Sequence, residues 1–98
     1  MVCTVLLEIR VKKEVAAGMA EGFKALFPDT RWYEGCIDIY VSQNQDDPQN
    51  FVIVETWETR QQYEKYLAWR TERGDIDNLA KLLDGSPPSI RYFNRLRA

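Results

Sequence analysis

Four stretches of the chain alternate apolar with polar side chains, which is the pattern of half-buried β-strands. In the third stretch, the odd-numbered residues from Phe51 to Trp57 share one face and the even-numbered residues from Val52 to Glu58 share the other. Apolar side chains lie on both faces, so this strand is expected to be covered on both sides. The four predicted strands span residues 2–11, 30–41, 51–58 and 89–97.

The segment between the first two strands repeats apolar residues every three or four positions, the spacing of an amphipathic helix. It runs from Lys13 to Phe27, and Pro28 is expected to end it because proline lacks the N–H group that a helix interior uses. Gly18 and Gly22 lie four positions apart and therefore share a helix face. Two interpretations of these glycines stay open, namely close packing of the helix on the sheet and room for a ligand.

A second helix is expected to begin at Thr59, which has capping-box spacing with Gln62, and to end at Gly74. A short third helix, capped by Asp75 or Asp77, follows before the last strand. The strand and helix signals together give the order β-α-β-β-α-β.

This order predicts an α+β fold of the ferredoxin-like, split β-α-β type, as a single domain over residues 1–98. The expected antiparallel sheet has the strand order fourth, first, third, second, with both main helices on one face. Because the other face also carries valine and isoleucine side chains, it requires a cover. A chain of 98 residues can form only a small hydrophobic core by itself, so we expect it to associate with a second copy as a homodimer.

Composition excludes several classes of function. The net charge of −2 gives no electrostatic reason to bind nucleic acid, and no apolar run approaches the ~20 residues of a membrane span. The chain is therefore expected to be cytoplasmic, without a membrane or nucleic-acid partner. Histidine is absent, which removes the commonest metal ligand and the usual general base, so we expect neither zinc nor histidine-ligated haem. Cys3 and Cys36 lie on strands that the third strand separates, and are expected to be reduced.

Five segments together resemble the antibiotic biosynthesis monooxygenase family, within the dimeric α+β barrel superfamily. The similarity covers nearly all of the chain. It implies two sheets packed face to face into a barrel, with the helices outside and a pocket in each subunit between helices and sheet. The segments are "TRWYEGC", "QNQDDPQNF", "VETWET", "YEKYLAW" and "PPSIRYF".

The resemblance also implies site residues. Trp57 matches a family tryptophan at the end of the third strand, and Tyr63 matches a pocket tyrosine six positions later. Two positions depart from the pattern: Ile53 stands where some of these oxygenases have asparagine, and Tyr66 stands where histidine is common. Because that histidine region supplies the axial ligand in haem-degrading relatives, haem degradation is disfavoured.

Related enzymes oxidise an anthrone, quinol or naphthol to a quinone with O2, and use neither metal nor flavin, so the resemblance implies that this chain needs no metal and no cofactor. In this chain Trp57 and Tyr66 are expected to wall a small aromatic substrate, and Tyr63 to hydrogen-bond its oxygen. Glu55 shares a strand face with Trp57 and is expected to remove the proton, because a carboxylate among aromatic rings has a raised pKa. The expected catalytic residues are Trp57, Tyr63 and Glu55, and the expected substrate-binding residues are Tyr66, Ile53, Arg70 and Phe23.

Alternatives stay open for each of these residues. Trp57 and the two tyrosines of the second helix are also compatible with core packing, and Glu55 is compatible with an ion pair to Arg10 or to another cation on a strand. The same fold also fits a non-catalytic dimer that binds a hydrophobic metabolite. The departures at Ile53 and Tyr66 favour such a binding protein, whereas the tryptophan–tyrosine pair favours an enzyme.

Overall fold

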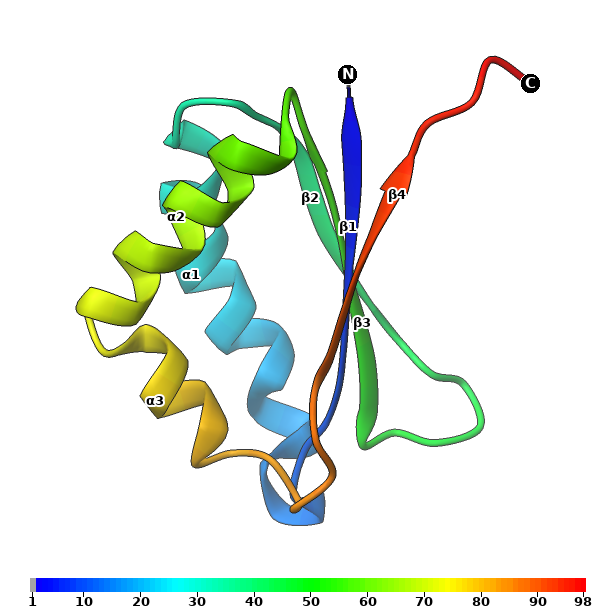
Figure 1. Ribbon diagram of the computed structural model, residues 1–98. Coiled ribbons are helices and arrows are strands. Elements are labelled where there is room, and N and C mark those ends of the chain that lie inside the picture. Colours follow the sequence, from blue (N-terminus) through cyan, green and yellow to red (C-terminus); the bar gives the residue numbers. More distant parts are fainter. Residues whose placement is uncertain (1) are drawn as a thin grey trace.

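The computed structural model describes residues 2–98, in which one sheet packs against a single layer of helices (Figure 1). The sheet is antiparallel and has the order β2-β3-β1-β4, which confirms the predicted topology. Within residues 2–98, no helix combines the length and apolarity that crossing a bilayer requires. The strands are β1 (Cys3–Arg10), β2 (Cys36–Gln43), β3 (Asn50–Trp57) and β4 (Ser89–Asn94). The helices are the 3-10 helix η1 (Lys13–Gly18) and the α-helices α1 (Met19–Trp32), α2 (Arg60–Glu72) and α3 (Asp75–Ala80).

The first helix extends past the proline that was expected to end it. Pro28 lies inside α1, and the helix continues to Trp32, so the predicted start of the second strand at residue 30 is wrong. The turn around the proline gains bonds from another helix. The Arg70 side chain donates to the backbone carbonyl of Leu26 at 2.9 Å and to the Thr30 hydroxyl at 3.0 Å. These bonds connect α1, on both sides of the proline, to α2.

A bulge early in β2 changes which side chains face the helices. The pairing with β3 skips one residue between Cys36 and Asp38, so Ile37 has no partner in the ladder. Ile37 is 54% exposed, whereas Ile39 is buried and Cys36 packs beside the core. The simple alternation predicted Ile37 and Ile39 on one face and Cys36 on the other, and the bulge makes that assignment wrong.

The two helix starts after β3 differ from each other. Thr59 caps α2 as predicted, since its hydroxyl accepts a bond from the backbone N–H of Gln62 at 3.2 Å. The residue before α3 is Gly74, with a φ of 84°, and no side chain caps that helix, so the predicted cap at Asp75 or Asp77 is wrong. The Asp75 carboxylate is already engaged by arginine, as described below.

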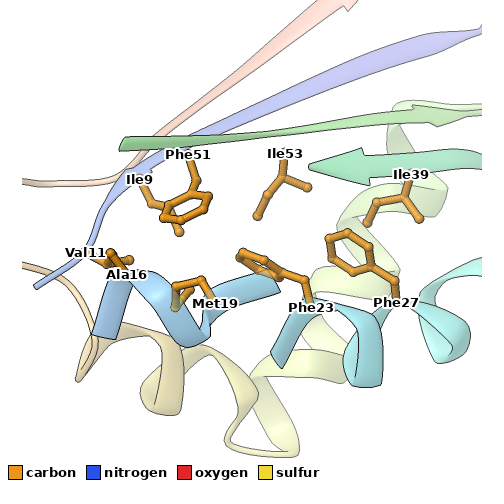
Figure 2. Packing of buried hydrophobic residues seen from close by; sticks show 9 residues of the cluster. All are labelled: Ile9, Val11, Ala16, Met19, Phe23, Phe27, Ile39, Phe51 and Ile53. Carbon is orange, nitrogen blue, oxygen red and sulfur yellow. The ribbon is translucent and has the colours of Figure 1, made fainter. Parts of the chain in front are cut away.

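The core divides into two halves, one of phenylalanine and aliphatic side chains and one built around tryptophan and tyrosine. In the first half, Phe23 and Phe27 of α1 point toward Ile53 of β3 and Ile39 of β2 (Figure 2). In the second half, Trp57 is completely buried. Cys3 and Cys36 pair with Trp57 from opposite sides of β3, and both are free thiols, which confirms the expectation that they are not bridged.

The sheet face away from the helices carries a row of apolar side chains. Leu6 and Tyr40 pair with Val54 from its two sides, so these residues lie side by side across three strands. Tyr40 is 49% exposed and Phe93 of β4 is 45% exposed. No helix of residues 2–98 covers this face (Figure 1).

Candidate functional site

A cavity of about 80 Å³ lies between the sheet and the helices, at the boundary of the two core halves. β3 supplies its floor because the odd-numbered residues of that strand face the helices, as the alternation predicted. Helices α1 and α2 supply the walls. Six of the seven residues expected at the site lie together here: Phe23, Ile53, Glu55, Tyr63, Tyr66 and Arg70.

Glu55 is the one carboxylate that is deeply buried in the described part of the chain, with 4% of its surface exposed. Burial raises its pKa to about 7, against opposing contributions from the hydrogen bond of Trp57 and the positive charge of Arg70. The alternative of an ion pair with Arg10 is wrong, because the Arg10 guanidinium binds Asp47 at 2.9 Å and also Asp84. Glu55 is therefore a proton acceptor whose charge changes near neutral pH.

Trp57 lies behind Glu55, away from the cavity lining. Its indole Nε1 donates a hydrogen bond to Glu55 Oε1 at 3.0 Å, and its exposed fraction is 0%. The ring packs against Tyr66 and Tyr63, with centroids 5.0 and 5.8 Å apart. Trp57 is thus both a core residue and the group that holds one carboxylate oxygen, and its polar contact is with Glu55 rather than with the cavity.

The two tyrosines of α2 differ in what their hydroxyls do. The Tyr66 hydroxyl lies 2.7 Å from that of Thr30 and accepts a bond from Arg70 Nε at 2.9 Å. Tyr63 is 1% exposed and lines the cavity, and its hydroxyl has no hydrogen-bond partner among residues 2–98. Burial and the nearby Glu55 carboxylate raise the Tyr63 pKa, which keeps this hydroxyl protonated and able to donate.

Arg70 lines the cavity and is the centre of a buried hydrogen-bond network. The side chain is 2% exposed, and besides Tyr66, Thr30 and the Leu26 carbonyl it binds Asp75 at 2.9 Å. Burial disfavours a charged Asp75, but hydrogen bonds from Arg70 and Arg73 outweigh it and lower the Asp75 pKa. Sequence reasoning missed Thr30 and Asp75, because one was assigned to a strand and the other to a helix cap.

Trp69 and Tyr33 pack beside the site without lining it. Their ring centroids are 5.4 Å apart, and the Arg70 guanidinium lies 4.8 Å from the Trp69 ring centroid. Trp32, at the end of α1, is 89% exposed. Within residues 2–98, no group of three Cys, Asp or Glu side chains is arranged to hold a metal ion.

A comparison with protein families matches residues 2–71 to the model described as antibiotic biosynthesis monooxygenase, which is most of the chain. This chain belongs to the antibiotic biosynthesis monooxygenase family. The matched region contains Glu55, Trp57, Tyr63, Tyr66 and Arg70, but ends before Asp75. No curated protein matches this member of the family.

Solved structures share the fold of this monooxygenase-family chain. A conserved protein from Methanosarcina mazei Go1 has a TM-score of 0.85 and 22% identity, over 98% of this chain and 94% of that one. A Deinococcus radiodurans protein described under the same family name has a TM-score of 0.80 and 24% identity, over 100% and 95%. An antibiotic biosynthesis monooxygenase has a TM-score of 0.83 and 17% identity, over 96% and 98%. At these identities the similarity establishes the fold.

A second, larger hollow adjoins the cavity of this family member. It is a groove of about 500 Å³ between α1 and α3, and Gly18 and Gly22 form part of its floor. A Cβ atom added at either glycine would meet no atom within 4 Å. The interpretation of these glycines as close helix–sheet contacts is therefore wrong, because both face open space.

Proposed function

We propose that this chain is a cofactor-independent monooxygenase that oxidises a phenolic aromatic compound of the anthrone, quinol or naphthol type to a quinone with O2. The observation that carries the proposal is Glu55, a buried carboxylate with a pKa of about 7 that lines an aromatic cavity. Such a group accepts protons at neutral pH, where an ordinary carboxylate is too weak a base. Membership of the monooxygenase family supports the reaction type.

Deprotonation is the step that this site is suited to perform. Trp57 holds Glu55 Oε1, while Oε2 has no hydrogen-bond partner among residues 2–98 and is available to a substrate proton. The unengaged hydroxyl of Tyr63 can donate to the oxygen on which the anion's charge collects. The dry aromatic surroundings strengthen both interactions, because little water competes for them.

For an anthrone, the overall reaction converts one ring methylene group and one molecule of O2 into one carbonyl group and one molecule of water. Glu55 takes one proton from the methylene carbon, and the resulting anion transfers electrons to O2 and forms a C–O bond. The peroxide receives the proton back, the second C–H bond then breaks, and the O–O bond cleaves with release of water. One oxygen atom of O2 enters the quinone and the other leaves in water, while the substrate is the reductant.

The test is oxygen uptake by purified protein, with a chelator present and no flavin added, against a panel of anthrones and quinols. We expect uptake that depends on both protein and substrate, and, for an anthrone, one O2 consumed and one water formed per molecule of quinone. Absence of uptake across the panel would reject the proposal.

A second candidate is a non-catalytic dimer that binds a hydrophobic metabolite. Ile53 favours it, since this apolar side chain lines the cavity where some related oxygenases have an amide. Binding of the same compounds, without oxygen uptake, would select this alternative.

Loss of the indole N–H should move the pH dependence of turnover. A hydrogen bond from Trp57 favours the charged form of Glu55, so its loss in Trp57→Phe should raise the carboxyl pKa. A bond to a charged group contributes about 1.5–3 kcal/mol, which corresponds to a shift of about one to two pH units. In kcat/KM against pH, the wild-type rate should rise through about pH 7, and the variant's midpoint should lie higher. Tyr63→Phe, which leaves Glu55 bonded, should lower the rate without moving the midpoint.

We further propose that the uncovered sheet face forms a homodimer through Leu6, Val54 and Tyr40. Such an obligate contact should bury more than about 2,000 Å² in total. Light scattering should give twice the chain mass of 11.5 kDa at micromolar concentration. Val54→Arg places a charge at the centre of the row and should shift the protein to monomers, with circular dichroism as the check on its fold. A wild-type monomer at that concentration would contradict the prediction.

A further inference from the structure

The two hollows beside Glu55 differ greatly in size. A dry cavity of about 150 Å³ is known to hold benzene, so the inner cavity of about 80 Å³ is smaller than one aromatic ring requires. The outer groove of about 500 Å³ falls in the range of small-molecule sites, which is roughly 300–1,000 Å³. The bulk of any aromatic ligand must therefore lie in the groove.

The groove and the cavity share a wall of side chains. Four residues line both of them: Phe23 and Leu26 of α1, and Asp75 and Leu79 of α3. A molecule seated in the groove thus needs to displace only side chains of this wall to bring one edge to Glu55. Tyr63, whose hydroxyl lacks a partner among the described residues, lies at that inner end.

The lining of the groove indicates what it accepts. Its walls are mainly apolar, with Val15, Met19 and Leu82 added to the shared residues. Of its two carboxylates, Asp75 is paired with Arg70 and Arg73, whereas Glu14 disfavours a ligand with a negative charge on this side. An elongated, neutral and apolar molecule fits this environment.

Gly18 and Gly22 set the width of the groove. Neither has a positive φ, and a Cβ atom at either would meet nothing within 4 Å, so neither backbone conformation nor packing requires glycine there. Glycine is among the least favoured residues inside a helix, yet Gly22 lies within α1. What both glycines supply is space above the helix backbone.

We infer that the groove between α1 and α3 binds the apolar body of an elongated, neutral, multi-ring phenol, and that Gly18 and Gly22 determine which ring systems fit. Only the edge of the substrate that carries the proton removed by Glu55 enters the inner cavity. This inference rests on the proposed function for the identity of the ligand, but it concerns a different surface and different residues.

The experiment measures binding of anthrone, which has three fused rings, and of hydroquinone, which has one. Gly22→Leu fills the groove, and Ala20→Leu places the same side chain on an exposed position of the same helix. Quenching of tryptophan fluorescence under nitrogen reports binding without turnover. We expect Gly22→Leu to weaken anthrone binding at least tenfold and to change hydroquinone binding less than twofold, while Ala20→Leu changes neither.

The melting temperature of Gly22→Leu should equal or exceed that of wild type, because leucine favours the helix more than glycine does. If Gly22→Leu fails to fold, Gly18→Leu provides a second variant in the lining of the groove, and we expect it to give the same selectivity. Equal anthrone affinity in the groove variants and wild type, or no measurable anthrone binding by wild type, would overturn the inference. Selective loss of anthrone binding without oxygen uptake would support the groove and reject the proposed oxidation.

Discussion

Glu55→Gln should lower turnover at least about a hundredfold while the protein stays folded. The amide keeps the shape of the side chain and can still accept the bond that Trp57 Nε1 donates at 3.0 Å. It cannot take a proton near neutral pH, and positioned acid–base groups contribute roughly 10²–10⁴-fold to rate. The measurement is kcat for oxygen uptake, and a folded variant with wild-type kcat would show that another group is the base.

Stability against pH supplies the control for this variant. The folded-state pKa of Glu55 is raised from 4.5 to about 7, so the folded protein binds more protons than the unfolded chain between these values. The free energy of unfolding should therefore fall as pH rises from about 4.5 through 7, by up to about 3 kcal/mol for this group. Glutamine does not titrate, so Glu55→Gln should remove this contribution and be at least as stable as wild type at pH 8. A lower stability at pH 8 would mean that loss of fold mimics loss of catalysis.

Arg70→Met should cost roughly 3 kcal/mol or more of stability. The substitution removes the buried arginine partner of Asp75. It also removes the donor of the hydrogen bonds to Tyr66, Thr30 and the Leu26 carbonyl, and the Arg70 side chain that makes all these contacts is 2% exposed. Breaking a buried ion pair by removing one member typically costs about 3–5 kcal/mol. For a domain of this size the melting temperature should fall by about 12 °C or more.

Arg73→Met is the matched control, because Arg73 binds the same Asp75 oxygen at 3.2 Å but its side chain is 49% exposed. An exposed pair contributes at most about 1 kcal/mol, so the melting temperature should change by only a few degrees. Equal losses in the two variants would show that the network around Arg70 does not stabilise the end of α1.

Alternation and helical spacing were sufficient to predict the strand order and the face of β3 that points toward the helices. Those features depend on the burial of apolar side chains, and buried positions recur in the sequence with the period of a strand or a helix. The same parity placed Glu55 and Ile53 beneath the helices, where the structure has them. The position of the inner cavity, between β3 and α2, followed from that parity.

Features that depend on contacts between distant segments were not predictable in this way. The helix continues past Pro28, and the turn around this proline bonds to Arg70, more than forty positions later, through the carbonyl of Leu26. The bulge at Ile37 interrupts the alternation of β2, and no local residue pattern marks it. The contact of Trp57 with Glu55 was missed for a related reason, since a tryptophan on a strand face gives no sign of where its N–H group points.

The state of the two thiols makes this protein convenient for site-specific chemical labelling. Cys3 is 6% exposed. Burial, with the nearby carboxylates of Glu55 and Asp38, raises the Cys36 pKa to about 11, and a protonated thiol is a poor nucleophile. Maleimide or iodoacetamide reagents at neutral pH should thus react slowly with both native cysteines. A cysteine introduced at an exposed position such as Ala20 would carry a fluorophore or spin label on the surface of α1, with no need to remove Cys3 or Cys36 first.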